Sequence, residues 1–231
     1  MPHGSAQRTT RALPRAHREQ VPRLRGALHL GAFPVAVAAG AVLVARAPTR
    51  PARLAAAVYA VTSALLFGVS AAYHRARGSP RLTAVLHRCD HANIYLIIAG
   101  TYTPLAVLAL HGDVRIAVLA VIWSGAAAGT VFRVGWPGAP RWLYTVLYLG
   151  LGWTALAVLP QLARGAGAVP LILVLAGGIA YSLGGVSYGL RRPDPLPGWF
   201  GFHEVFHACT ILGYAAQYAA VWLVAAQARG H

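Results

Sequence analysis

The sequence predicts an all-α fold, a polytopic membrane protein built as a seven-transmembrane helix bundle. Of its 231 residues, 57% are hydrophobic and only 11% are charged, whereas a soluble domain carries about 25% charged residues. Apolar runs close to the length of about 20 residues that a helix needs to cross a bilayer recur after residue 26. All 20 basic residues are arginine, and most lie in the N-terminal segment or between the apolar runs, as is typical of membrane proteins.

Seven apolar runs account for the chain from residue 26 onwards. Each is expected to form one span: 27–45, 52–74, 90–110, 114–132, 142–159, 168–190 and 203–227. The fifth span begins with Trp142 and Tyr144, aromatic residues that suit the membrane interface. The sixth is rich in glycine and serine, which allow close contact between helices. Because the connections are short, spans that follow one another are expected to be neighbours in space.

The arginine distribution predicts the orientation in the membrane. Residues 1–25 are polar and arginine-rich, and we expect a disordered cytoplasmic tail there. With the N-terminus inside, the cytoplasmic segments hold 14 arginines and the outer segments six. The positive-inside rule therefore favours a cytoplasmic N-terminus and a C-terminus outside, with 26–231 as one domain in the cell membrane. A nucleic-acid partner is not expected, because no soluble face gathers the basic residues.

Two histidines at the start of the seventh span, His203 and His207, give the clearest sign of a functional site. Their spacing of four residues puts both side chains on one face of a helix. Two imidazoles so placed can bind one metal ion, and ionisable residues inside a membrane are rare and usually functional. The segment also matches the H-E-x-x-H pattern of zinc proteases, in which Glu204 would be the general base.

Three further polar residues are expected at the same membrane surface as this pair. Ser70 and His74 end the second span, and Asp90 opens the third. The chain leaves the membrane after the second span and re-enters at the third from the same side. The seventh span, also odd-numbered, enters from that side too. With the predicted orientation, these groups all lie in the cytoplasmic leaflet.

Four other histidines are expected to lie outside this site. His87 and His91 flank Asp90, but nothing in their spacing selects them as ligands, and we expect both at the membrane interface. We expect His29 and His111 at the opposite leaflet, and exclude them on that ground.

The chemistry of this set suits a catalytic metal, because three neutral imidazoles and a water are the ligands of a zinc site with an open position. We therefore predict a zinc site with three ligands: His74, His203 and His207. Bound zinc activates water for hydrolysis. Asp90 could accept a hydrogen bond from that water as general base, in competition with Glu204. Ser70, one turn from His74, could orient the water or polarise a substrate carbonyl.

The segments that carry these residues are similar to three motifs of a known family. Ser70-Ala-Ala-Tyr-His74 resembles the first motif, the stretch from Asp90 to Pro104 the second, and His203-Glu-Val-Phe-His207 the third. Over the seven spans the chain resembles the hemolysin III family, the bacterial branch of the progestin and adipoQ receptor proteins, which include the adiponectin receptors. The resemblance implies an internal N-terminus and a hemolysin III-like domain over 26–231. It also implies zinc on the three histidines, with Asp90 holding a water and Ser70 beside it.

Together with the predicted zinc site, the resemblance implies a zinc-dependent hydrolase acting on a lipid amide, because the family is grouped with membrane hydrolases that are inferred to be metal-dependent and include alkaline ceramidases. The expected substrate is a ceramide-like or other N-acyl membrane lipid, and no protein partner is predicted. Zinc could instead be a staple in a non-catalytic sensor or homeostasis protein, although structural zinc usually has four protein ligands. A pore-forming protein would need more polar spans. An intramembrane metalloprotease would need a third ligand, for which Asp90 is the only candidate.

Overall fold

The computed structural model describes residues 22–76 and 78–228, and most of them are helical. The elements are α1 (Ala27–Arg46), α2 (Arg50–Arg75), α3 (Pro80–Ala109), α4 (Gly112–Gly135), α5 (Arg141–Gly152), the 3-10 helix η1 (Trp153–Val158), α6 (Leu159–Ala166), α7 (Ala168–Leu190) and α8 (Phe202–Gln227). Within these residues, seven helical segments are long and apolar enough to cross a membrane, with α5, η1 and α6 together forming one. The predicted all-α fold of seven spans is confirmed. Most of the predicted disordered tail lies outside the described residues.

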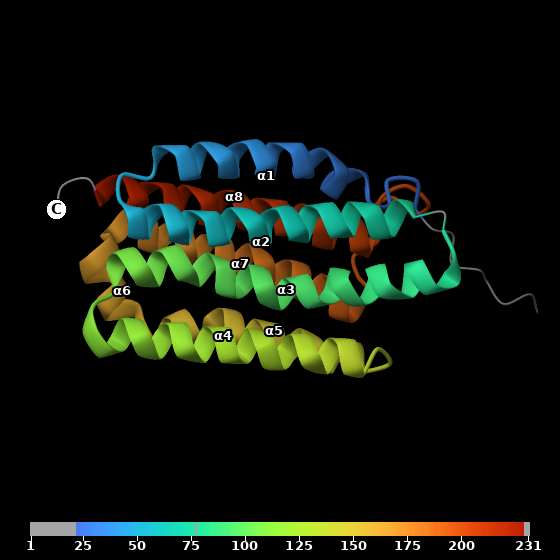
Figure 1. Ribbon diagram of the computed structural model, residues 1–231. Helices are drawn as coiled ribbons and strands as arrows, with labels where there is room; N and C mark the ends of the chain where they lie inside the picture. The colour runs from blue at the N-terminus through green and yellow to red at the C-terminus, as the bar shows by residue number, and fades with distance from the viewer. Residues whose placement is uncertain (1–21, 77, 229–231) are drawn as a thin grey trace, which may run out of the picture.

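The helices lie side by side along one common direction (Figure 1). Helices that follow one another in sequence pack together, as expected, in the pairs α1–α2, α2–α3, α3–α4 and α7–α8. α3 runs through the middle of the bundle, where it contacts α2, α4, α5, α6 and α8, and it is the most buried span. α8 packs against α1, α3 and α7. The last helix of the chain therefore lies beside the first and the third.

The third span begins ten residues earlier than the apolar pattern predicts, at Pro80 rather than at residue 90. The side chain of Ser79 caps the helix by accepting a hydrogen bond of 3.3 Å from the backbone N–H of Leu82. Pro80 occupies the first helical turn, where its missing N–H costs nothing. The extension mixes apolar residues with Arg81, His87 and Arg88, so hydropathy alone does not detect it. It places Asp90 inside a helix rather than at its start.

The fifth span is not the continuous helix that the sequence predicts. α5 ends at Gly152 and the chain continues as η1 before α6 begins. The freed backbone groups are bound by Tyr102 of α3, whose hydroxyl donates to the carbonyl of Gly152 at 2.7 Å and accepts from the N–H of Ala155 at 2.5 Å. Irregular backbone at membrane depth needs such partners, because lipid provides none.

Glycines bring α7 close to α8, as expected of the sixth span. A Cβ atom added at Gly184 would lie 2.9 Å from Cβ of Cys209, and one added at Gly177 would lie 2.7 Å from Nε2 of Gln217. Both distances are shorter than van der Waals contact between such atoms. The side chain of Gln217 can therefore lie directly against the backbone of α7.

Candidate metal centre

Three histidines from two helices meet at one end of the bundle. His74 lies in the last turn of α2, while His203 and His207 lie one turn apart at the start of α8. Each can offer one ring nitrogen such that the three ligand atoms lie within 4.8 Å of one another. Nε2 of His203 is 3.0 Å from Nε2 of His74, and His207 is only 1% exposed. The structure thus brings together the three residues that the sequence nominated as ligands.

The arrangement fits a small metal ion that prefers nitrogen ligands. Tetrahedral zinc with Zn–N bonds of about 2.0–2.1 Å separates its ligand nitrogens by roughly 3.3 Å, so small side-chain movements suffice to close this cluster. Nδ1 of His207 is buried without a hydrogen-bond partner in the part of the chain that the structure describes. Neutral imidazoles suit zinc among the common divalent ions, and so the set fits the metal that the sequence predicts.

Local hydrogen bonds hold the start of α8, and Glu204 belongs to them. Its Oε2 accepts from the N–H of Gly201 at 2.9 Å, and its Oε1 accepts from Nε of Arg25 at 2.6 Å. Asp194 adds a further cap by accepting from the N–H of Phe202 at 2.8 Å. Glu204 is 0% exposed and both of its oxygens are bound. Glu204 therefore caps the start of α8 and pairs with Arg25.

Ser70 and Asp90 lie on the wall of an internal cavity that His203 and His207 also line. Ser70 is buried, and its side chain interacts with the Asp90 carboxylate. Asp90 is mostly buried as well. Its Oδ2 lies 3.9 Å from Nδ1 of the His91 ring. The carboxyl and hydroxyl side chains that the sequence selected thus line the same cavity as two of the three imidazoles.

A fourth imidazole, that of His29 in α1, joins this end of the bundle, and its predicted exclusion is wrong. Its ring stacks on that of His207 with centroids 3.7 Å apart and planes inclined by 9°. It is 2% exposed, and neither ring nitrogen has a partner among the described residues. The physical reason is simple: the first span is odd-numbered, so it enters the membrane from the same side as the third and the seventh. His111 does lie at the other end, before α4.

His91 is also more central than predicted. It is buried on the cavity wall rather than interfacial. Its Nδ1 lies 3.0 Å from the carbonyl of His87, and its Nε2 lies 3.2 Å from the hydroxyl of Tyr188. A neutral ring that donates from Nδ1 and accepts at Nε2 satisfies both contacts. Both ring nitrogens of His91 are therefore hydrogen-bonded, and His91 is not included among the candidate ligands. His87 is half-buried, with its ring against Tyr73.

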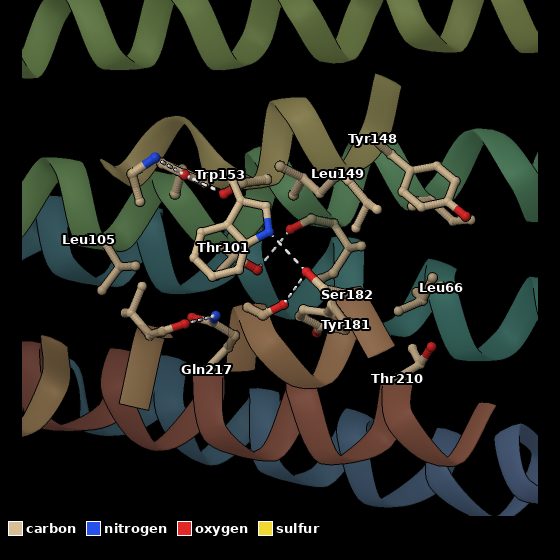
Figure 2. Close-up of a pocket in the computed structure, with 18 of the residues that line it drawn as sticks. Leu66, Thr101, Leu105, Tyr148, Leu149, Trp153, Tyr181, Ser182, Thr210 and Gln217 are labelled. Carbon is tan, nitrogen blue, oxygen red and sulfur yellow. Dashed lines mark hydrogen bonds between the residues drawn. The ribbon is translucent and has the colours of Figure 1, made fainter. Parts of the chain in front are cut away.

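The cavity extends from the histidines far along the bundle. On α3 it is lined at helical spacing by Asp90, Ile94, Ile97, Thr101 and Leu105. From Asp90 to Leu105 the helix rises by about 23 Å, roughly three quarters of the hydrocarbon thickness of a bilayer. Apolar side chains such as Leu66, Leu105 and Leu149 form much of the wall (Figure 2). The i, i+3, i+4 pattern of α3 carries the sequence signal for this wall, but packing against lipid produces the same pattern.

Fold and site together define a multi-pass membrane protein with seven membrane spans in its described residues and a candidate three-histidine metal centre at one end of an internal apolar cavity. The chain belongs to the haemolysin-III related family, whose family model matches residues 17–218. The resemblance inferred from the three motifs is thereby confirmed.

Individual relatives agree with this assignment. The chain is similar to Hemolysin-3 of Bacillus cereus, with 31% identity over 173 residues that cover 75% of this chain and 76% of the relative. A Hemolysin-3 homolog of Bacillus subtilis (strain 168) is 31% identical over 137 residues, or 59% and 62% of the two chains. The human Monocyte to macrophage differentiation factor is 25% identical over 174 residues, or 74% and 70% of the two chains.

Proposed function

We propose that this protein is a zinc-dependent hydrolase of a lipid amide, with a ceramide-like or other N-acyl lipid as substrate. One observation carries the proposal: a cluster of three imidazoles lies at the end of an apolar cavity whose wall also holds Ser70 and Asp90. A structural metal site would need neither a hydroxyl and a carboxylate beside it nor a cavity of this length.

The three histidines, Asp90 and Ser70 would each have a separate role in amide hydrolysis. His74, His203 and His207 would hold the zinc ion. When bound, zinc polarises a carbonyl group and lowers the pKa of a coordinated water towards neutrality. Asp90 would take a proton from water as the water oxygen bonds to the carbonyl carbon. It would then deliver that proton to the amine nitrogen as the C–N bond breaks. Ser70 would donate a hydrogen bond to the carbonyl oxygen and so orient the amide.

The apolar wall favours a lipid over a soluble amide. A fatty acyl chain would occupy the space along α3 and exchange one apolar environment for another on leaving the bilayer. The chain's length would hold the reacting carbonyl at the histidine end. Positioning of this kind contributes to catalysis by reducing the entropy lost on the way to the transition state.

A non-catalytic zinc staple is the competing function, and Asp90→Asn separates the two. We expect about one zinc per chain in both wild type and variant, measured by mass spectrometry of the purified proteins. Hydrolysis of an N-acyl lipid should fall at least about 100-fold in the variant, the usual size of a lost general base. Asp113→Asn, at the exposed start of α4, is the matched control and should keep full activity.

Two results would contradict the proposal. Wild type that hydrolyses no lipid amide across a panel of ceramides and other N-acyl lipids would favour the staple. Full zinc occupancy after both His203→Ala and His207→Ala would reject the metal site itself.

A further inference from the structure

A second group of polar side chains lies deep in the cavity, far from the histidines. We call it the deep polar cluster and define it as Thr101, Tyr102, Trp153, Tyr181, Ser182 and Gln217. Figure 2 shows five of them among the leucines of the wall: Thr101, Trp153, Tyr181, Ser182 and Gln217. Measured along α8, Gln217 is ten residues from His207, a rise of about 15 Å. Measured along α3, Thr101 is 11 residues from Asp90, a rise of about 16 Å. The two polar regions are therefore separated by about half the bilayer core.

Most groups of the deep polar cluster satisfy one another or the nearby backbone. Trp153 donates from Nε1 to the hydroxyl of Ser182 at 2.9 Å, and that hydroxyl donates to the carbonyl of Gly178 at 2.8 Å. The hydroxyl of Thr101 donates to the carbonyl of Ile97 at 2.8 Å. These groups need no further partner, and the cluster is thus a built and ordered part of the wall (Figure 2).

Gln217 is the exception. It is 5% exposed, and its Nε2 donates to the carbonyl of Val174 at 3.0 Å. Its Oε1 has no partner in the described part of the chain. Flipping the side-chain amide by 180° would not give Oε1 a donor, because Oε1 would then face another acceptor, the Val174 carbonyl. The hydroxyl of Tyr181 on the same wall is likewise buried and without a partner among the described residues. The wall thus presents an acceptor that requires a donor, and a hydroxyl that can both donate and accept.

We propose that the deep polar cluster binds a hydroxyl group carried on the chain of the lipid, about 15 Å from the group held at the histidines. Oε1 of Gln217 requires a donor, which a hydroxyl supplies and a ketone, an ester carbonyl or a double bond does not; a carbonyl could accept only from Tyr181 and would leave Oε1 without a partner. The cluster contains no charged side chain, so a second carboxylate or an amine would be buried without a counter-ion. The inference deepens the proposed function and rests on it for what occupies the histidine end.

The experiment compares the binding of matched fatty acids, the acyl products of amide hydrolysis, to purified protein in detergent or nanodiscs. The acids share one chain length and carry no hydroxyl, or one hydroxyl near the carboxyl group, at mid-chain or towards the methyl end. Affinity is measured by competition with a fluorescent fatty acid. We expect the acid whose hydroxyl lies about 15 Å from its carboxylate to bind about tenfold tighter than the unsubstituted acid, the effect of one net hydrogen bond.

Gln217→Met tests the residue itself, because methionine keeps the length of the side chain and removes the acceptor. We expect the variant to bind both acids equally, with affinity for the unsubstituted acid kept. Gln161→Met is the matched control, since Gln161 lies on α6 and does not line the cavity, and it should keep the tenfold preference. If Gln217→Met fails to fold, as judged by circular dichroism, Tyr181→Phe carries the same expectation of a reduced preference.

Equal binding of all the acids by wild type would overturn the inference, because water would then be sufficient to satisfy Gln217. A preference that survives in Gln217→Met, or no binding of any acid, would overturn it as well. The assay requires no turnover, so a protein that shows the preference but hydrolyses nothing would refute the proposed reaction and leave the deep site standing.

Discussion

His29 offers the sharpest test of how the candidate metal centre is built. Its ring stacks face to face on His207, with 3.7 Å between centroids, and meets Phe67 edge-on at 5.1 Å. His29→Ala removes both contacts and leaves the His207 ring free to turn. Aromatic pairs of this kind contribute about 0.5–1.5 kcal/mol. If the stacking energy fixes the His207 ring in the orientation that binds the metal, the zinc affinity of His29→Ala should be about two- to tenfold lower than that of wild type.

The assay is competition for zinc with a coloured chelator, using purified protein in detergent. His29→Phe keeps a flat ring against His207 and should stay within about twofold of wild type, the margin below the smallest stacking energy. His111→Ala, at the other end of the bundle, should leave zinc affinity unchanged. Zinc binding by His29→Ala at wild-type strength would refute the positioning role. A loss of affinity in His29→Phe as large as in His29→Ala would show that a ring nitrogen, and not the stacking, is what matters.

Three other substitutions test separate parts of the structure. Glu204→Ala leaves the N–H of Gly201 without its acceptor, and we expect unfolding in detergent to become about 1–3 kcal/mol easier; an unchanged melting temperature would contradict this. Gly26→Ala should lower zinc affinity, because Gly26 has φ of +75° and an added Cβ would lie 2.5 Å from Cβ of His74; chelator competition that matches wild type would exclude the clash. Tyr102→Phe removes the hydroxyl that binds the backbone at the break after α5. It should therefore lower the melting temperature through the loss of about 1–3 kcal/mol, and a fully stable variant would show that water replaces that hydroxyl.

The spans could be predicted from the sequence because the bilayer imposes a length and a polarity on each of them. The break after α5 could not, since hydropathy is the same whether an apolar segment is helical or unwound. The early start of α3 could not be predicted either, because Arg81, His87 and Arg88 interrupt the apolar residues of its first turns. Capping by Ser79 and Pro80 was the available signal there.

The three candidate ligands could be selected because helix spacing and the alternation of span direction are both readable from the chain. The same alternation, applied correctly to the first span, would have brought His29 to this end as well. The burial of His91 and the pairing of Glu204 with Arg25 depend on which helices pack together and how they are rotated. Side-chain partners separated by 179 residues, as Arg25 and Glu204 are, leave no trace in local patterns.

The wide separation of the ligands along the chain has a consequence for biosynthesis. His74 and His203 are 129 residues apart, and ribosomes add roughly 5–20 residues per second. The second helix therefore waits for something on the order of ten seconds before its partner emerges. Because two of the three candidate ligands lie on the final helix, all three could bind a metal ion only after that helix has inserted. An ion bound there would link α2 to α8 in the complete bundle. A nascent chain arrested before that helix would have only one of the three imidazoles, His74, in the membrane.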